Sequence, residues 1–351
     1  MNIISTCQMG PGTFEAKFIP LSKIDFIDNI YVLRKQKGPT IRKVSYILLP
    51  KVCRIKWISL LITPFILMYH TRIKNARIIL AYHVIPHAFY AFVASLLSGV
   101  PFCISQTGLK IERLSSKWLF GRIILYIFNK AKYINVPGSK SRQHWIDKGI
   151  NPAKISILHS TVSTDDFFNT KSNIEYDFIF IGRLATEKNI ELMFKAIIEL
   201  KKRNLEPMMV IVGDGPEEIK LKEFVYSNEL VKNIVFTGFQ ADVAKWLNTA
   251  EIFVMASTSD AMPTSLMQAM ACERICISSR VGNIPDLIIH ENNGFLFESN
   301  NLEGLTKLMA LTLERKGNYC ELRRKARLTI IQNHSHTIAQ KKWEDQLVNF
   351  E

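Results

Sequence analysis

The stretch YDFIFIGRLATEKNIELMFKAIIELKKRNLEPMMVIV, residues 176–212, carries one complete strand–helix–strand pattern. Its first six residues are mostly apolar and stop at Gly182, which is typical of a strand buried on both faces. Residues 189–202 then place apolar side chains three and four positions apart, as an amphipathic helix requires. A second apolar run, residues 208–212, completes the unit. The stretch therefore predicts a β–α–β unit with parallel strands.

The same alternation extends to both sides of this unit. Downstream it predicts strands at residues 234–236, 252–255 and 275–278, and helices at residues 217–227, 241–249 and 264–271. Upstream it predicts strands at residues 76–82, 100–105 and 132–136, and helices at residues 88–97 and 123–130. The opening 50 residues show no clear period. Alternation of this kind predicts an α/β fold with parallel sheets, whose ligands bind beyond the carboxyl ends of the strands.

The length of 351 residues suggests two domains. A polar stretch, residues 161–175, marks the expected boundary between them. We therefore expect an N-terminal domain over residues 1–165 and a C-terminal domain over residues 166–335. A last amphipathic helix is expected within residues 336–351.

The net charge of +14 is unevenly distributed along the chain. Residues 1–160 hold 23 Lys and Arg against 5 Asp and Glu, whereas residues 161–351 hold 22 against 26. A basic half beside a mildly acidic half indicates two units with different partners. The basic half is expected to attract a polyanion, either a phosphate backbone or an anionic membrane leaflet. No nucleic-acid-binding signature is present, so a membrane surface is favoured over nucleic acid.

An uncharged run from Trp57 to Tyr69 bears on that choice. It is flanked by Lys51, Arg54 and Lys56 on one side and by further basic residues on the other. A membrane-spanning helix needs about 20 apolar residues, so the run is too short to cross. Two interpretations stay open: a buried core helix, or a segment that dips into one leaflet while its basic neighbours pair with lipid phosphates.

The cysteines and the first residues indicate the compartment. Six cysteines occur without a CxxC pair or an accompanying His/Cys cluster, which predicts neither disulfides nor a metal site and fits a reducing cytoplasm. The first ten residues lack the features of a signal peptide. We therefore expect a cytoplasmic protein that binds the cytoplasmic face of the membrane peripherally.

The strongest functional signal is SDAMPTSLMQAMA, residues 259–271, directly after a predicted buried strand. A short loop opens a helix at Thr264, and the free N–H groups and positive dipole of such a helix end suit a phosphate. Asp260 lies in the loop and Gln268 lies one turn into the helix, so both are expected to face the same cavity. Asp260 has an alternative role as a plain helix cap.

A second signal is GRLATEKN, residues 182–189, again after a predicted strand. Arg183 and Lys188 place two cations on one short loop, which suits a diphosphate; the alternative is two solvated surface residues. In a third stretch, Gly213-Asp-Gly215, two glycines would let the backbone approach a ligand closely.

Together these motifs resemble glycosyltransferase family 4, the retaining enzymes of the GT-B fold. The resemblance covers residues 130–350 well and residues 76–110 weakly. It rests on the order and spacing of five stretches: Gly182–Asn189, Val212–Pro216, Phe236–Gly238, Pro263–Ala271 and Asn293–Phe297. It implies two Rossmann-like domains that face each other across a cleft, and a C-terminal helix that crosses back to the N-terminal domain.

The resemblance also implies roles for the donor-side residues. Arg183 and Lys188 would bind the diphosphate of a nucleotide sugar and stabilise the leaving phosphate. Asp260 and Gln268 stand where the family has the two acids of its Glu-x7-Glu motif, beside the donor sugar and the ribose. The backbone from Met262 to Ser265 would hold the sugar and its phosphate. The remaining residues expected at the donor site, some of them near the base, are Gly182, Gly213, Gly238, Phe239, Pro263 and Thr264.

Departures from the family pattern concern the acids. Asp260 is one methylene shorter than Glu, Gln268 lacks the charge, and Ala261 replaces a glycine. Further along, Asn283 and Asp286 replace the usual Gly and Glu of another loop. These changes leave catalytic competence as a separate question from the fold.

The expected acceptor side lies in the N-terminal domain. Gln106, Thr107 and Gly108 fall where many family members have a loop near the acceptor, and His87 is a further candidate. The alternatives are a strand cap for Gln106 and a structural histidine for His87.

The resulting hypothesis is a metal-independent hexosyltransferase of surface polysaccharide biosynthesis, without a cofactor. It would move a hexose or N-acetylhexosamine from a nucleotide diphosphate sugar, with a UDP-sugar preferred, to a lipid-linked or membrane-associated glycan. Two alternatives remain: a nucleotide-sugar epimerase of the same fold, and a non-catalytic membrane scaffold.

Overall fold

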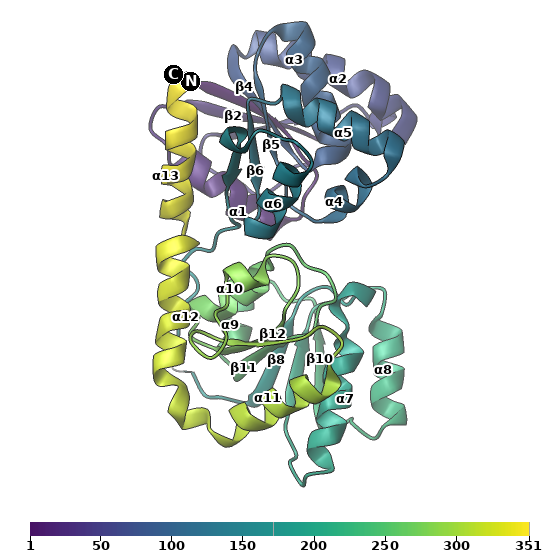
Figure 1. Cartoon of the computed structure of the whole chain (residues 1–351), viewed down its shortest axis with the longest axis vertical. Helices are drawn as coiled ribbons and strands as arrows, with labels where there is room; N and C mark the ends of the chain where they lie inside the picture. The colour runs from purple at the N-terminus through teal and green to yellow at the C-terminus, as the bar shows by residue number, and fades with distance from the viewer. Residues whose placement is uncertain (171, 351) are drawn as a thin grey trace. The chain divides into compact units, whose positions relative to one another are not determined.

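A computed structural model describes residues 1–170 and 172–350 of the chain. The chain divides into two compact units, one formed by residues 1–161 with residues 336–351 and the other by residues 162–335. Each unit is an α/β layer structure around its own parallel sheet, as Figure 1 shows. Among the described residues, no helix combines the length and apolar character needed to cross a bilayer.

The N-terminal unit contains a seven-stranded sheet of order β3-β2-β1-β4-β5-β6-β7, parallel throughout. Its strands are β1 (Asn2–Thr6), β2 (Asn29–Arg34), β3 (Val44–Leu48), β4 (Ala76–Tyr82), β5 (Phe102–Ser105), β6 (Tyr133–Val136) and β7 (Ile155–Ile157). Its helices are α1 (Pro11–Ser22), α2 (Lys56–Ile73), α3 (Phe89–Ser98), α4 (Lys110–Ser115), α5 (Trp118–Lys130), α6 (Ser139–Asp147) and α13 (His336–Leu347).

Helices cover both faces of this sheet, because successive side chains of a strand point to opposite faces. Ile4 and Ile79 pack in a core with side chains of α2, α3, α5 and α6. Their neighbours Ile3 and Ile78 pack in a second core with α1 and α13. Trp343 of α13 is fully buried in that second core, so the last helix is an integral layer of the N-terminal unit.

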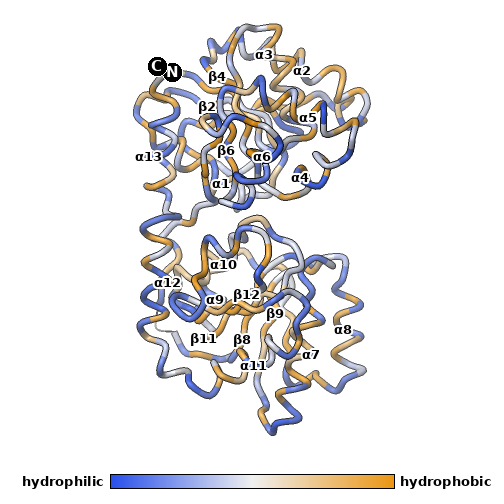
Figure 2. Tube along the Cα trace, viewed as in Figure 1, coloured by the Kyte–Doolittle hydropathy of each residue, from blue (hydrophilic) through white to orange (hydrophobic). Residues whose placement is uncertain are grey.

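The C-terminal unit contains a six-stranded parallel sheet of order β10-β9-β8-β11-β12-β13. Its strands are β8 (Tyr176–Ile181), β9 (Met209–Val212), β10 (Ile234–Gly238), β11 (Ala250–Met255), β12 (Ile275–Ser279) and β13 (Phe295–Phe297). Its helices are α7 (Ile190–Lys201), α8 (Glu218–Ser227), α9 (Val243–Leu247), α10 (Thr264–Ala271), α11 (Leu302–Glu314) and α12 (Cys320–Asn333). Figure 2 shows hydrophobic residues along its central strands β8 and β11, which are buried on both faces.

The predicted α/β class with parallel sheets is confirmed, but the opening 50 residues hold more order than their pattern indicated. They form β1, α1, β2 and β3, and β1 lies inside the sheet. α1 buries Phe14, Lys17, Phe18 and Pro20, so most of its circumference is covered and no polar face marks it in the sequence. The helix predicted at residues 123–130 begins earlier, at Trp118. Its first turn exposes apolar residues, so this turn lacks the polar outer face that marks an amphipathic helix in the sequence.

Candidate active site

The loops after β8 and β11 leave the C-terminal sheet where its strand order reverses. The chain continues from β8 to β9 and β10 on one side, and β11 begins the series on the other side. Loops that leave neighbouring strands in opposite directions open a crevice, which is where parallel sheets bind ligands. The segments 182–189 and 256–263 start at this crevice, so the two strongest sequence motifs meet at one edge of the sheet.

The contact between the two loops is an ion pair. Lys188 Nζ lies 2.5 Å from Asp260 Oδ2, and the two side chains are 20% and 16% exposed. The backbone N–H of Thr258 also donates to the carbonyl of Glu187, at 2.9 Å. Lys188 is therefore held at the crevice, close enough to a free surface for a ligand to reach it.

Asp260 does not cap α10. The N-cap position of α10 is Pro263, which makes no side-chain cap hydrogen bond. The carboxylate of Asp260 instead bonds Lys188. The first-turn N–H groups of α10 thus keep their donor capacity for another acceptor.

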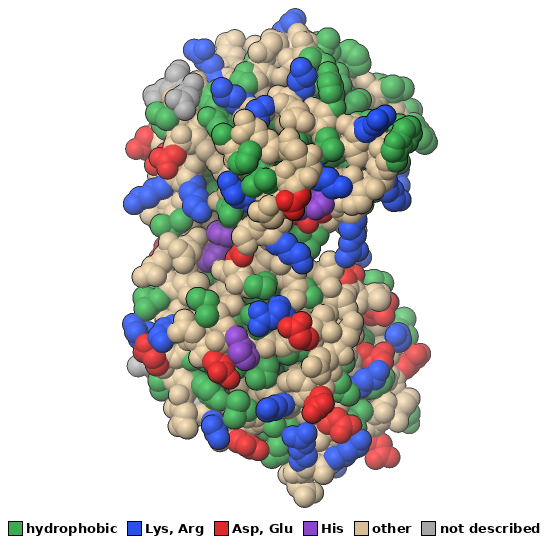
Figure 3. Space-filling view, viewed as in Figure 1, with side chains coloured by type: hydrophobic (Ala, Val, Ile, Leu, Met, Phe, Trp, Pro, Cys, Tyr) green, Lys and Arg blue, Asp and Glu red, His purple; other side chains and the backbone are tan. Residues whose placement is uncertain are grey.

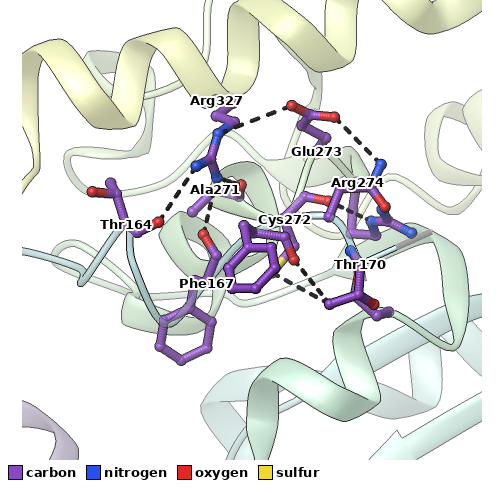
Figure 4. A network of polar contacts seen from close by, with 11 residues as sticks. Thr164, Phe167, Thr170, Ala271, Cys272, Glu273, Arg274 and Arg327 are labelled. Atoms are coloured by element: carbon purple, nitrogen blue, oxygen red, sulfur yellow. Dashed lines mark hydrogen bonds and ion pairs between the residues drawn. The ribbon is translucent and has the colours of Figure 1, made fainter. Parts of the chain in front are cut away.

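Arg327 of α12 anchors the other end of α10. Its guanidinium donates to the carbonyl oxygens of Ala271, Phe167 and Thr164, as Figure 4 shows. Ala271 is the last residue of α10, where a cation is favourable beside the free carbonyls. These bonds fix α10, and with it the position of its N-terminus at the crevice.

Arg183, which immediately follows Gly182 at the end of β8, has an exposed side chain. Among residues 1–170 and 172–350 its guanidinium makes no hydrogen bond or ion pair. Its five N–H donors are therefore available to an anion in solution.

The residues around the start of α10 are graded in exposure. Met262 and Pro263 are buried, whereas Thr264, Ser265 and Gln268 are half-buried. Gln268 lies one helical turn after Thr264, on the same face of α10. This arrangement leaves two hydroxyls and one amide at the helix start able to meet a polar ligand.

The glycines after β9 serve a contact within the protein. A Cβ at Gly213 would lie 2.0 Å from the carbonyl oxygen of Gly182, and one at Gly215 would lie 2.3 Å from that of Leu184. The N–H of Leu184 donates to Asp214 O at 2.7 Å. The two loops therefore pack backbone against backbone, so these glycines shape the Arg183 loop. Their close approach to a ligand stays a prediction.

Gly238 and Phe239 lie at the carboxyl end of β10. Gly238 has a positive φ of 68° and its carbonyl accepts from Gly213 N–H at 2.8 Å. The ring of Phe239 is exposed, so it offers an aromatic face to a planar group.

The acceptor-side candidates belong to the N-terminal unit, and Gln106 there is part of the framework. It is buried, donates to Gly108 O at 2.9 Å and to Glu112 Oε1 at 2.7 Å, and accepts from Trp145 Nε1 at 2.8 Å. These bonds use its amide within the fold, and its predicted place near the acceptor stays a prediction.

The two histidines near β4 are neutral at physiological pH. Thr6 Oγ1 lies 2.8 Å from His87 Nδ1, and Thr107 Oγ1 lies 3.1 Å from His83 Nδ1. Burial, followed by the charges of His83 and Lys35, lowers the pKa of His87 to about 3. Burial also lowers the pKa of His83. At neutral pH both imidazoles therefore act as hydrogen-bonding groups without charge.

Two basic residues that the sequence analysis passed over lie at the carboxyl edge of the N-terminal sheet. Arg34 ends β2 and Lys35 follows it. The available signal was their position directly after the apolar residues 30–33.

Within the described part of the chain, no cluster of three or more His, Cys, Asp or Glu side chains is arranged to hold a metal ion.

The sequence matches a known family over the C-terminal unit. The model of the family "Glycosyl transferases group 1" matches residues 162–329. N-acetyl-alpha-D-glucosaminyl L-malate synthase of Bacillus anthracis is 25% identical over 245 residues, which are 66% of this chain and 64% of that protein. The UDP-Gal:alpha-D-GlcNAc-diphosphoundecaprenol alpha-1,3-galactosyltransferase of Escherichia coli is 24% identical over 353 residues, with 89% of this chain and 88% of that protein covered.

The fold of the chain also matches a solved structure. HepE of Anabaena in complex with UDP superimposes with a TM-score of 0.82 at 15% sequence identity, over 99% of this chain and 100% of that one. At that identity the likeness concerns the fold, which is GT-B.

Proposed function

We propose, from the premise that residues 162–329 are a group 1 glycosyl transferase domain, that this chain is a retaining glycosyltransferase. It transfers a hexose or an N-acetylhexosamine from a UDP-sugar to a lipid-linked or membrane-associated glycan in surface polysaccharide biosynthesis. The observation that carries the proposal is the Lys188–Asp260 pair at the crevice where the C-terminal sheet reverses its strand order. The UDP in the HepE complex supports the choice of nucleotide.

In the proposed mechanism the donor's diphosphate binds between Arg183, Lys188 and the N-terminus of α10. Arg183 is available to pair with it, and Lys188 exchanges part of its contact with Asp260 for a phosphate oxygen. As the bond from sugar to phosphate breaks, negative charge grows on the leaving diphosphate. Once the diphosphate is bound, the two cations and the helix dipole stabilise that charge, so no divalent metal is needed in this proposal.

Asp260 and Gln268 act on the sugar and the nucleoside. Once Lys188 turns toward the diphosphate, the carboxylate of Asp260 lies free beside the donor sugar, where a negative charge favours a positively charged anomeric carbon. Gln268 hydrogen-bonds the ribose hydroxyls from the first turns of α10. The exposed ring of Phe239 stacks on the base.

The proposed membrane contact is the outer face of α2, which is apolar although the inner face carries both polar residues and apolar ones such as Leu67. The side that faces the protein carries Ser59, Thr63 and Thr71, and Ser59 Oγ lies 3.1 Å from Tyr90 Oη. The outer side carries large exposed apolar residues: Trp57, Leu61, Ile62, Phe65, Tyr69 and Ile73. A helix in water places polar residues outside, so this arrangement fits an apolar surrounding and argues against the buried core helix.

A second helix of the same unit also exposes apolar side chains. α5 exposes Trp118, Leu119, Phe120, Ile123 and Tyr126. Figure 3 shows hydrophobic side chains together with Lys and Arg on the N-terminal unit over these helices. Basic residues border both helices, among them Arg54, Lys56, Lys117, Arg122 and Lys130. Apolar anchors with a basic rim suit an anionic leaflet, and we propose its cytoplasmic face.

The relative from Escherichia coli supports the proposed acceptor. Its name specifies an acceptor linked to diphosphoundecaprenol, and the match covers both units of this chain. The epimerase and scaffold alternatives predict different results. An epimerase works on free nucleotide sugar without an acceptor, and a scaffold binds no nucleotide.

The decisive experiment measures nucleotide binding first and transfer second. Thermal shifts with UDP, GDP, ADP and their sugars identify the donor, because a ligand at 100 times its Kd adds about 2.7 kcal/mol of stability. Arg183→Ala should weaken UDP binding by about 1.5–3 kcal/mol, whereas the control Arg203→Ala, on an exposed turn of the same unit, should not. Incubation of the donor with and without a membrane extract then separates transferase from epimerase. Absence of any nucleotide binding would leave the scaffold.

A further inference from the structure

The N-terminal unit contains a pocket at the carboxyl edge of its own sheet. It has a volume of about 490 Å³. Residues after β1, β2, β3 and β4 contribute to it, together with the first turns of α2. Its described lining includes the basic residues Arg34, Lys35 and Lys56 and the apolar residues Leu49, Trp57 and Leu60. We call it the Arg34 pocket.

Arg34 is a buried cation with unused donors. Its residue is 7% exposed, and its Nη2 donates to Met9 O at 3.1 Å. Its Nε and Nη1 are buried and have no hydrogen-bond partner among the described residues. The guanidinium carbon lies 5.0 Å from the centre of the Phe14 ring, which holds the guanidinium in place. A buried guanidinium without a carboxylate is costly, which favours an anion as its partner.

The surroundings of Arg34 add positive charge and keep space. Lys35 and Lys56 line the same pocket, and no Asp or Glu is present among the described lining residues. A Cβ at Gly38 would lie 2.5 Å from Arg34 Nη1, so the glycine makes room for the guanidinium at this position. Three cations around one small volume match a phosphate or diphosphate group.

Much of the rest of the lining is apolar, and Gln8, Ser59, His87 and Tyr90 add uncharged polar groups. Leu49, Leu60 and Pro86 form one part of it, and the ring of Trp57 forms another. Trp57 is 79% exposed and also belongs to the outer face of α2 described above. The pocket therefore joins a buried cation to the apolar face proposed to enter the membrane. A ligand that fills it needs an anionic head and an apolar chain.

We propose that the Arg34 pocket binds the phosphate group and the adjoining carbons of a lipid phosphate, the carrier of the acceptor glycan. The inference rests on the proposed function only where it identifies the lipid as the carrier of the acceptor glycan. The pocket and the class of its ligand are inferred from Arg34, its two neighbouring lysines and the apolar part of the lining. The same phosphate chemistry also occurs in a free anion. The chain of the lipid is what distinguishes the two sources.

Three soluble probes separate the head from the chain: farnesyl diphosphate, farnesol and inorganic diphosphate. The full-length protein is titrated with each by calorimetry in saturating UDP, so that the donor site is occupied. We expect farnesyl diphosphate to bind at least tenfold more tightly than either other probe. Equal affinity for inorganic diphosphate would overturn the lipid assignment, and no binding of either diphosphate would overturn the site.

Variants assign the binding to the pocket. Arg34→Met should reduce the affinity for farnesyl diphosphate at least tenfold, and Trp57→Ala should remove its advantage over inorganic diphosphate. Lys35→Gln with Lys56→Gln alters only exposed side chains and gives the same test if Arg34→Met fails to fold. Arg42→Ala, an exposed change in the same unit, is the control that should leave binding unchanged. An unchanged affinity in the double lysine variant would contradict the proposal.

The two proposals fail separately. UDP affinity measured on the same variants should stay at the wild-type value, because Arg34, Lys35 and Lys56 belong to the N-terminal unit. Wild-type protein that binds farnesyl diphosphate but no nucleotide would remove the proposed function and keep the pocket. Protein that transfers sugar but does not bind the lipid probe would remove the pocket and keep the function.

Discussion

Lys188 and Asp260, 72 positions apart in the chain, form an ion pair of 2.5 Å between the loops that follow β8 and β11. The pair links the two motifs that the sequence marked independently. Under the proposed function, a diphosphate and Asp260 would compete for one ammonium group. This competition makes the two side chains separable by experiment.

The first prediction concerns that competition. Lys188→Ala should weaken UDP binding by about 1.5–3 kcal/mol, because it removes a charge-assisted contact. Asp260→Asn should keep or strengthen UDP binding, because it removes the competing carboxylate, and yet lower turnover. Calorimetry with UDP and initial rates of transfer measure the two effects. Wild-type turnover in Asp260→Asn would show that the carboxylate only positions Lys188.

The second prediction concerns Gln268. If its amide bonds the ribose, Gln268→Ala should weaken binding of UDP by about 0.5–1.5 kcal/mol, the usual contribution of a neutral hydrogen bond. Gln268→Glu should keep or tighten binding, because a carboxylate accepts from hydroxyls more strongly. The matched comparison uses UDP and 2′-deoxy-UDP on each variant. An alanine variant that still discriminates between the two nucleotides would rule out this contact.

The third prediction concerns the close approach of two loops. Gly213→Ala would put a methyl group 2.0 Å from the carbonyl oxygen of Gly182, so the loop that carries Arg183 must move. We expect a loss of 1 to about 3 kcal/mol in the free energy of unfolding and a loss of UDP binding. Gly317→Ala is the control, since nothing lies within 4 Å of its added Cβ. Urea unfolding and a UDP titration measure both effects; equal stability of the two variants would contradict the prediction.

The fourth prediction concerns the membrane face. Vesicles of phosphatidylcholine mixed with phosphatidylglycerol should sediment the protein at low salt, and high salt should release part of it. Replacement of Lys51, Arg54 and Lys56 by Gln should remove the salt-sensitive part of vesicle binding, at about 1 kcal/mol per charge. Trp57→Ser with Trp118→Ser should remove the salt-resistant part, because these exposed rings are 79% and 75% accessible.

A matched control tests whether charge alone explains the capture. Gln at positions Lys232, Lys245 and Lys307 removes the same charge from exposed sites of the C-terminal unit. These changes should leave sedimentation unchanged. Equal loss in both triple variants would point to net charge, and absence of capture by either vesicle type would favour a soluble acceptor.

The fifth prediction concerns pH. The pKa of His87 is lowered to about 3 in the folded protein. Between pH 3 and pH 6.5 the unfolded chain therefore binds a proton at His87 that the folded chain does not bind. The contribution of neutral His87 is complete above pH 6.5 and is lost as the pH falls from there toward 3, by up to about 1.4 kcal/mol per pH unit. His87→Asn should remove this slope. Urea unfolding of both proteins between pH 7.5 and 4.5 checks it; a constant difference would indicate an ordinary histidine.

The sequence anticipated the strands near the predicted sites better than the N-terminal ones. Residues 76–82 and 176–181 form strands with the predicted bounds, since a buried parallel strand is a short continuous apolar run. Strands β1 to β3 were not predicted. The helix α1, which follows β1, is covered on most sides and has no polar face, so no alternation of strand and helix was visible in this part of the sequence. The run that forms α2 kept two interpretations, a buried core helix and a membrane-dipping segment, because an apolar run does not indicate which of its faces packs against the protein.

Local pattern alone determined the α/β class, the positions of the loops at strand ends and the candidate cations Arg183 and Lys188, because period and turn chemistry depend on near neighbours in the chain. The tertiary structure decided what those residues meet. In the folded chain Lys188 pairs with Asp260, and the glycines of residues 213–215 pack against the backbone of another loop. Arg34 is buried, and two of its nitrogens have no hydrogen-bond partner among the described residues. Each of these depends on the packing of strands far apart in the chain, which periodicity does not encode.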